Sequence, residues 1–343
     1  MSGQLALRRP TFAPMRIAFC VGNPVTDGVA AIALSWVREL AIQYPEDRYL
    51  VLSEYPLEGY LEVLPKERVT VRGLPRRYSF FPFWSDAFLY KRLLSFHPQL
   101  VITAPSHHRI LSRYKQARVT SMAGLTSQDS ELTFMPMPSS DYVLLDADQK
   151  HAIKEQWSFG REYFMLTGPL PSEGQLTFLL QAFSLFKNRQ QSGLRLVLPF
   201  SVTKHYPSLA KKIDQYKYRS ALVITESITP KQVAQLAGAA YALVALGSPG
   251  TALIAILQAW RVGIPLLTVH ESGLLGVAQQ SVLFAADLTK EALATMLMQI
   301  YKDESLRLQL IRQGQRCLAD IDASLLPAAL HQQLQQLVSS SVS

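Results

Sequence analysis

The 343-residue chain is 48% hydrophobic and carries a formal net charge of +8. Its length is enough for two α/β domains, and the prolines spread along the sequence indicate a globular protein. No apolar run is long enough to span a membrane, and residues 1–14 lack the apolar segment of a secretory signal.

The cysteines and the charge narrow the expected compartment and partners. Cys20 and Cys317 lie far apart in apolar or helical patterns, which favours buried thiols in a reducing, cytoplasmic compartment. The basic residues form no stripe interleaved with stacking aromatics, so nucleic acid is not an expected partner. The positive charge suits an anionic substrate, a peripheral position at the inner face of a membrane, or simple solubility.

The first half of the chain reads as strands that alternate with helices. Residues 15–21 are a short apolar run, typical of a buried parallel strand, and follow an N-terminus that we expect to be extended or disordered over residues 1–14. A loop over 22–28, with Asp27 as helix N-cap, leads into a helix over 29–44. Further strands are predicted at 49–53, 69–71, 100–103 and 119–121, and a helix at 147–156. Together these form a first domain over 15–157.

One segment of the first half has two interpretations. Residues 76–92 are dense in aromatic side chains and are flanked by basic ones. Such a face suits lipid head groups or an acyl-linked acceptor. We favour the other interpretation, a loop and helix packed on the sheet.

The second half repeats the pattern after a linker near 157–162. Thr229 is a predicted N-cap, Pro230 fits the first turn of a helix ending at Gly238, and residues 247–250 read as a small-residue turn. The other predicted elements are strands at 163–168, 194–199, 222–225, 240–246 and 282–284, a strand opening at Pro265, and helices at 253–262, 289–301, 303–318 and 323–337. The second domain is therefore predicted over 163–322, with a C-terminal helical segment over 323–343.

The stretch from Ala240 carries a family resemblance. It reads A-Y-A-L-V-A-L-G-S-P-G-T-A-L-I-A-I-L-Q-A-W-R-V-G-I-P-L-L, and it resembles, without a gap, the nucleotide-sugar segment of retaining glycosyltransferases with the GT-B fold (group 1, or family 4-like). The shared frame is Ala240, Ala259, Gly263 and Pro265. The family's two glutamates fall on Gly250 and Gln258. Of these, Gln258 can still hydrogen-bond a ribose, whereas Gly250 offers only backbone.

A second match opens the second domain. Residues 167–183 follow the family pattern V-G-R-L-x-x-x-K-G-x-x-x-L-x-x-A-F in register. The family's arginine and lysine neutralise the donor diphosphate as the glycosidic bond breaks. Here Pro169 and Gly174 take their places, and Glu173 is expected to repel a phosphate. Lys204, His205, Lys211 and Lys212 are alternative cations, although a solvated helix face is the simpler interpretation of these four.

The resemblance implies a fold and a set of candidate residues. The fold is α/β, with two Rossmann-like doubly wound domains facing a cleft, and the C-terminal helix crosses back onto the first domain. Gly28 matches a family glycine that the acceptor or the donor phosphates approach. His107 and His108 follow a predicted strand. They are either acceptor or phosphate contacts or surface residues without a function. No third ligand lies at metal spacing, so we expect no metal. The donor-binding candidates are Gly168, Gly247, Ser248, Gly250, Thr251 and Gln258.

Two functional hypotheses follow from the resemblance. The first is a glycosyltransferase that moves a sugar from a nucleotide-diphospho-sugar, such as a UDP- or GDP-sugar, to a polysaccharide, lipid-linked or protein-linked acceptor. The second is a catalytically degenerate homologue that acts as a binding or scaffolding subunit beside an active glycosyltransferase. The absent cations and carboxylates favour the second, and the retained frame favours the first. A sugar-nucleotide epimerase of the same fold is a third interpretation, but its carboxylate and histidine pattern is not visible.

Overall fold

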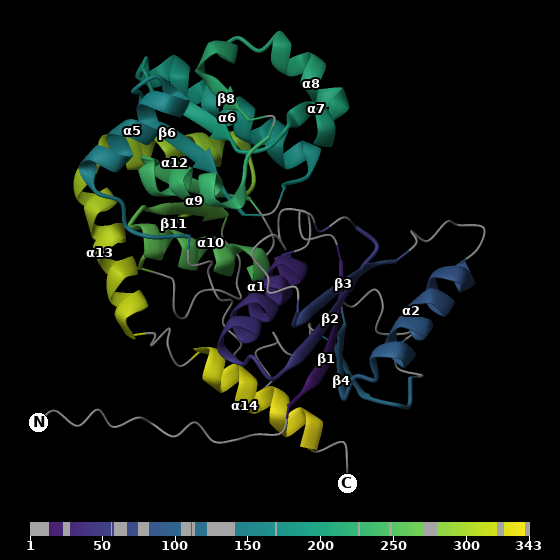
Figure 1. Cartoon of the computed structure of the whole chain (residues 1–343). Helices are drawn as coiled ribbons and strands as arrows, with labels where there is room; N and C mark the ends of the chain where they lie inside the picture. The colour runs from purple at the N-terminus through teal and green to yellow at the C-terminus, as the bar shows by residue number, and fades with distance from the viewer. Residues whose placement is uncertain are drawn as a thin grey trace, which may run out of the picture.

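The computed structural model describes residues 14–22, 28–55, 57, 67–74, 82–103, 111, 114–121, 141–168, 170–225, 227–246, 249–269, 280–320 and 326–339. Within these residues the chain forms two wholly parallel β-sheets with helices on their faces (Figure 1). The first sheet has the order β3-β2-β1-β4-β5 and the second the order β11-β10-β9-β6-β7-β8. The predicted α/β class with two Rossmann-like halves is confirmed.

The strands and helices have the following bounds. The first sheet contains β1 (Arg16–Val21), β2 (Arg48–Ser53), β3 (Val69–Gly73), β4 (Leu100–Thr103) and β5 (Arg118–Ser121). The second contains β6 (Tyr163–Leu166), β7 (Arg195–Leu198), β8 (Leu222–Ile224), β9 (Ala242–Ala245), β10 (Leu266–Val269) and β11 (Val282–Ala285). The helices are α1 (Gly28–Gln43), α2 (Pro82–Phe96), α5 (Ala147–Ser158), α6 (Glu173–Gln190), α7 (Val202–His205), α8 (Pro207–Asp214), the 3₁₀ turn η1 (Arg219–Ala221), α9 (Pro230–Ala239), α10 (Pro249–Val262), α12 (Lys290–Lys302), α13 (Glu304–Asp320) and α14 (Leu326–Ser339).

The first sheet is covered on both faces, which explains the unbroken apolar run of β1. Ile17 and Phe19 pack with α1 on one face, while Ala18 and Cys20 pack with α2 on the other. Successive side chains of a strand point to opposite faces, so a strand between two helical layers has no polar side. Helix α2 contributes Leu89 to this core, whereas its Phe88 is exposed, so the described part of the aromatic segment packs on the sheet along one face only.

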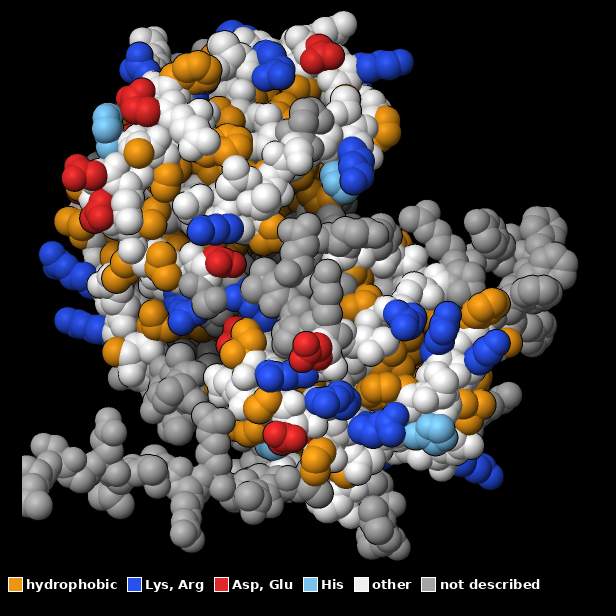
Figure 2. Space-filling model, viewed as in Figure 1, with side chains coloured by type: hydrophobic (Ala, Val, Ile, Leu, Met, Phe, Trp, Pro, Cys, Tyr) orange, Lys and Arg blue, Asp and Glu red, His pale blue; other side chains and the backbone are white. Residues whose placement is uncertain are grey.

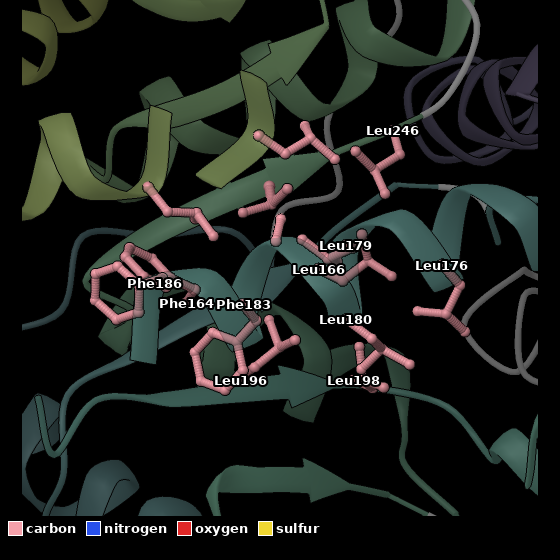
Figure 3. Packing of buried hydrophobic residues seen from close by; sticks show 14 of the residues in the cluster. Phe164, Leu166, Leu176, Leu179, Leu180, Phe183, Phe186, Leu196, Leu198 and Leu246 are labelled. Carbon is pink, nitrogen blue, oxygen red and sulfur yellow. The ribbon is translucent and has the colours of Figure 1, made fainter. Parts of the chain in front are cut away.

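The second sheet is built in the same way and has the larger core. Phe164 and Leu166 of β6 pack against α6 and α12, and Phe183 and Phe186 of α6 complete the aromatic centre of this layer (Figure 3). The opposite face, with Tyr163 and Met165, packs against α9 and α10. Thr229 caps α9 as predicted, because its hydroxyl accepts the Gln232 N–H at 3.3 Å.

Several boundaries differ from the prediction by one or more residues, and two of the differences lie in the candidate donor stretch. Helix α10 begins at Pro249, so the Pro249 and Gly250 of the predicted turn lie in its first turn. Proline at the first helical position loses no hydrogen bond, and for that reason the helix extends back to it. The strand expected from Ala240 begins only at Ala242, since Ala240 is the C-cap of α9.

Of the two helices that flank the second half in sequence, α5 packs on the second sheet and α14 returns to the first. Helix α5 packs against α9, and its Ile153 and Trp157 lie in the core of the second sheet. Helix α14, at the end of the chain, packs on α1 and β4 and buries Leu330 and Leu334 in the first core (Figure 1). Ile254 of α10 also packs against that first core. The proposed domain limits and the cleft between the halves stay predictions.

Candidate functional site at the carboxyl edge of the second sheet

The carboxyl ends of the second sheet collect most of the predicted donor-side residues. All of its strands are parallel, so the carboxyl ends of β6, β9 and β10 lie at one edge. In open α/β sheets this edge is where ligands bind. Helix α10 begins there, directly after β9, and its Gly250 and Thr251 backbone lies in the first helical turn.

Gln258 is brought to this edge by a hydrogen bond to the end of β6. The Thr167 hydroxyl donates to Gln258 Oε1 at 3.4 Å, and Thr167 itself is buried. Gln258 is half-buried, and within the described part of the chain its amide nitrogen has no hydrogen-bond partner. The amide therefore offers two N–H donors at the position where the family carries a glutamate.

Gly168 provides open backbone beside Thr167. Its φ is +83°, a conformation that side-chain-bearing residues rarely adopt, and a Cβ added there would meet no atom within 4 Å. The main chain at this point is exposed. Gly168, which matches a glycine of the family pattern, therefore lies where a ligand can approach the backbone closely.

Gln175 joins two loops of this edge, and sequence reasoning missed it. Its Nε2 donates to the Leu246 carbonyl at 2.7 Å, and its Oε1 accepts the Ser172 N–H at 2.7 Å. The signal that points to half of this arrangement is the Ser-x-x-Gln capping box at residues 172–175. The bond to Leu246, the residue directly after β9, has no sequence signature.

The first turn of α6 contains no Lys or Arg, because Gly174 stands where the family has its lysine. Pro169 lies outside the described residues. Glu173 is directed toward α8, where its carboxylate accepts the Ser208 hydroxyl at 2.6 Å. Burial and the nearby Glu173 charge raise the pKa of Tyr206 to about 12. Glu173 therefore links α6 to α8. Its repulsion of a phosphate stays a prediction.

Two further groups at this edge have chemical potential. Thr225, directly after β8, is buried, and its hydroxyl has no partner within the described chain. Lys204 and His205 lie exposed on α7, which follows β7. Burial and the Lys204 charge lower the pKa of His205, which favours its neutral imidazole form.

The remaining candidates lie wholly or partly outside the described residues. Gly247, Ser248, His107 and His108 lie outside the described residues, and for Gly28 only the backbone at the start of α1 is described. The described residues contain no group of His, Cys, Asp and Glu side chains arranged to hold a metal ion. None of their helices is long and apolar enough to cross a membrane.

Comparison with solved structures identifies the architecture. No protein-family model and no curated protein matches the sequence. WaaG, a glycosyltransferase involved in lipopolysaccharide biosynthesis, is 14% identical with a TM-score of 0.64, covering 91% of this chain and 98% of its own. HepE from Anabaena, in complex with UDP and glucose, is 12% identical with a TM-score of 0.70, covering 94% and 100%. A UDP-N-acetylglucosamine 2-epimerase is 10% identical with a TM-score of 0.53, covering 88% and 91%.

These likenesses extend over nearly the whole of each chain. The protein therefore has the GT-B fold, as the resemblance in its sequence implied. At such low identities the fold is shared by transferases and by an epimerase, so activity must be argued from the site.

Proposed function

We propose that this chain is a glycosyltransferase that takes a nucleotide-diphospho-sugar at the carboxyl edge of its second sheet and transfers the sugar to a polysaccharide, lipid-linked or protein-linked acceptor. The observation that carries the proposal is the placement of the Gln258 amide beside Thr167 and the open backbone of Gly168. A neutral amide donor and exposed main chain suit the hydroxyl groups of a ribose or a sugar.

The structural neighbours support the choice of donor class. HepE was solved with UDP-glucose, and the S. aureus protein MnaA was solved with UDP. We assign this chain a UDP-sugar donor, with a GDP-sugar as the alternative. Gly247, Ser248, Gly250 and Thr251 would contact its phosphates through backbone or hydroxyl groups at the start of α10. Gly28, His107 and His108 are the proposed acceptor or phosphate contacts.

Sugar transfer requires the site to stabilise the leaving diphosphate as well as to bind the donor. Cleavage of the glycosidic bond leaves negative charge on the diphosphate, and preorganised positive groups are what stabilise that charge. In the first turn of α6 the Ser172 hydroxyl already accepts the Gln175 N–H, and Glu173 adds a negative charge. We therefore expect slow transfer and weak diphosphate binding.

That same turn supports a second candidate function. A degenerate homologue that binds glycan and acts as a scaffolding subunit beside an active glycosyltransferase requires no diphosphate cations. The capped, acidic first turn of α6 is what such a protein would tolerate.

A peripheral membrane position is part of the proposal. On α2 the exposed Phe88 and Leu94 flank the exposed Lys91, and Leu89 and Leu93 face the core. Figure 2 shows Lys and Arg side chains gathered over α2 and the first sheet, interleaved with hydrophobic ones. Apolar side chains among cations are the composition of an interfacial helix, and we propose that this face meets the inner leaflet.

The test is a panel of sugar nucleotides screened by thermal shift, followed by product analysis. A ligand at ten times its Kd stabilises the native state by about 1.4 kcal/mol and raises the melting temperature. We expect a UDP-sugar to do this only near millimolar concentration. Gln258→Leu should abolish the shift, whereas Gln299→Leu, at an exposed position of α12, should leave it intact. Transfer or hydrolysis products support the first function. Glycan binding without turnover supports the second, and a nucleotide sugar returned with inverted C2 would identify an epimerase instead.

A further inference from the structure

Phe159 is a residue that both packing and backbone geometry disfavour. It is the C-cap of α5, its φ is +56°, and its side chain is 74% exposed. Glycine or asparagine usually occupies this left-handed position, because a bulky side chain is strained there. Exposing a phenylalanine also forgoes the free energy of burying it. Conflicts of this kind in a native sequence collect at functional positions.

Three arginines lie at the amino ends of adjacent strands on this side of the second sheet, and one of them contacts Phe159. Arg161 precedes β6, Arg195 opens β7 and Arg219 precedes β8, and these strands are neighbours in the sheet. The Arg195 guanidinium lies over the Phe159 ring, with Cζ 4.7 Å from its centroid. This edge is opposite to the candidate donor edge, since all strands of the sheet are parallel.

Two of these arginines and Lys187 donate hydrogen bonds to backbone carbonyls. Arg195 Nη1 donates to the Ser220 carbonyl at 3.3 Å, and Arg219 Nη1 donates to the Leu222 carbonyl at 3.4 Å. Lys187, in the last turn of α6, donates to the Leu194 carbonyl at 3.2 Å. Side chains fixed in this way lose little conformational entropy when a partner binds.

No carboxylate in the described part of the chain pairs with these cations. Arg161, Lys187, Arg195 and Arg219 are absent from the ion pairs of the described residues. Glu162 is adjacent to Arg161 but pairs with Lys154 at 2.5 Å, and Glu155 lies over Gly160. Burial and then the charges of Arg195 and Arg161 lower the pKa of Lys187.

We propose that Phe159 and the cations Arg161, Lys187, Arg195 and Arg219 form a docking surface for an acidic segment of a partner protein. A small anion would need the cations but not an exposed ring. Arginines with an aromatic residue are the composition of protein interface centres. An acidic segment would supply the missing negative charge, and an apolar residue within it would cover the ring.

The proposal is tested on the full chain by fluorescence anisotropy. The probe is a short labelled peptide of glutamate and aspartate with one central leucine, and the same peptide with glutamine and asparagine is the neutral control. We expect the acidic peptide to bind and its affinity to fall as salt rises from about 50 to about 200 mM. Arg161→Glu with Arg219→Glu should weaken binding about tenfold. Arg312→Glu with Arg316→Glu, on the exposed face of α13, is matched in charge and should weaken binding less than about twofold.

Phe159→Asn separates binding from folding. Asparagine tolerates the left-handed conformation, so the melting temperature should hold or rise while peptide affinity falls severalfold. Equal losses in the cluster variant and the α13 control would reduce the effect to net charge and overturn the proposal. It is also overturned if the acidic peptide does not bind, or if duplex DNA or anionic vesicles bind more tightly and lose that binding in the cluster variant.

Discussion

The imidazole of His331 and the carboxylate of Asp47 meet at 2.8 Å in the buried joint between the last helix and the first domain. Asp47 also accepts the Met15 N–H at 2.7 Å and the Tyr49 hydroxyl at 3.1 Å. The His331 ring stacks on Tyr44, with centroids 3.6 Å apart. One carboxylate thereby organises the start of the first sheet and the docking of α14.

Removing this carboxylate should destabilise the protein strongly. Asp47→Ala leaves three buried donors without their acceptor, and we expect a loss of about 3 kcal/mol in the free energy of unfolding. Glu46→Ala, at the exposed neighbouring position, should change it by less than about 0.5 kcal/mol. Chemical denaturation measures both variants. Equal stability of the Asp47→Ala and Glu46→Ala variants would show that the Asp47 carboxylate does not stabilise the packing of α14.

Packing of α13 on α10 depends on the absence of a side chain at Gly314. A Cβ there would lie 2.4 Å from Trp260 Cδ1, and Trp260 is fixed by its hydrogen bond to Ser281 at 3.1 Å. Gly314→Ala should therefore cost about 1–3 kcal/mol of stability. Thermal denaturation measures the loss.

Gly174→Ala is the matched control for that substitution. It adds the same methyl group in the exposed first turn of α6, where the nearest atom is 3.9 Å away. We expect it to be neutral or stabilising by about 0.5 kcal/mol. A harmless Gly314→Ala variant would mean that α13 can shift away from Trp260 without cost.

Restoring a cation at Gly174 should strengthen nucleotide binding. The position is exposed and open, so a lysine fits without displacing a neighbour. If the diphosphate lies beside this turn, Gly174→Lys should raise UDP affinity about fivefold in calorimetry, whereas Gly174→Gln should not. An unchanged affinity in both variants would place the phosphates away from α6.

The two thiols should differ in reactivity. Burial raises the pKa of Cys20 to about 12, so at pH 8 almost none of it is the reactive thiolate. Cys317 is only partly buried. A chromogenic disulfide reagent should modify Cys317 first and Cys20 only when the chain unfolds in guanidinium. Cys317→Ser should remove the early phase, and an early phase that persists would contradict the burial of Cys20.

The strands were predictable because each has a local sequence pattern of its own. Buried parallel strands such as β1 are continuous apolar runs, and caps such as Thr229 act on residues close in sequence. The position of α5 was less accessible, because a helix with few buried residues shows only weakly which core it joins. It lies on α9, although the chain order suggested the first domain.

The site could be predicted only where the family frame preserved it. Gly168 and Gln258 were named from that frame, and the structure describes Thr167, the neighbour of Gly168, in contact with Gln258. Gln175 was missed because its partner is the Leu246 carbonyl, and a carbonyl is the same in every residue. The Asp47–His331 pair joins positions 284 residues apart, and neither residue belongs to a local pattern.

Helix α14 determines how this protein can be divided. Leu330 and Leu334 belong to the core built around β1 and α1, so the amino-terminal half is assembled from two separate lengths of chain. A fragment cut between the halves would expose the apolar bed of that helix to water and invite aggregation. Isolating this half intact would require the terminal helix to be supplied as a second peptide, or fused to it by a designed linker.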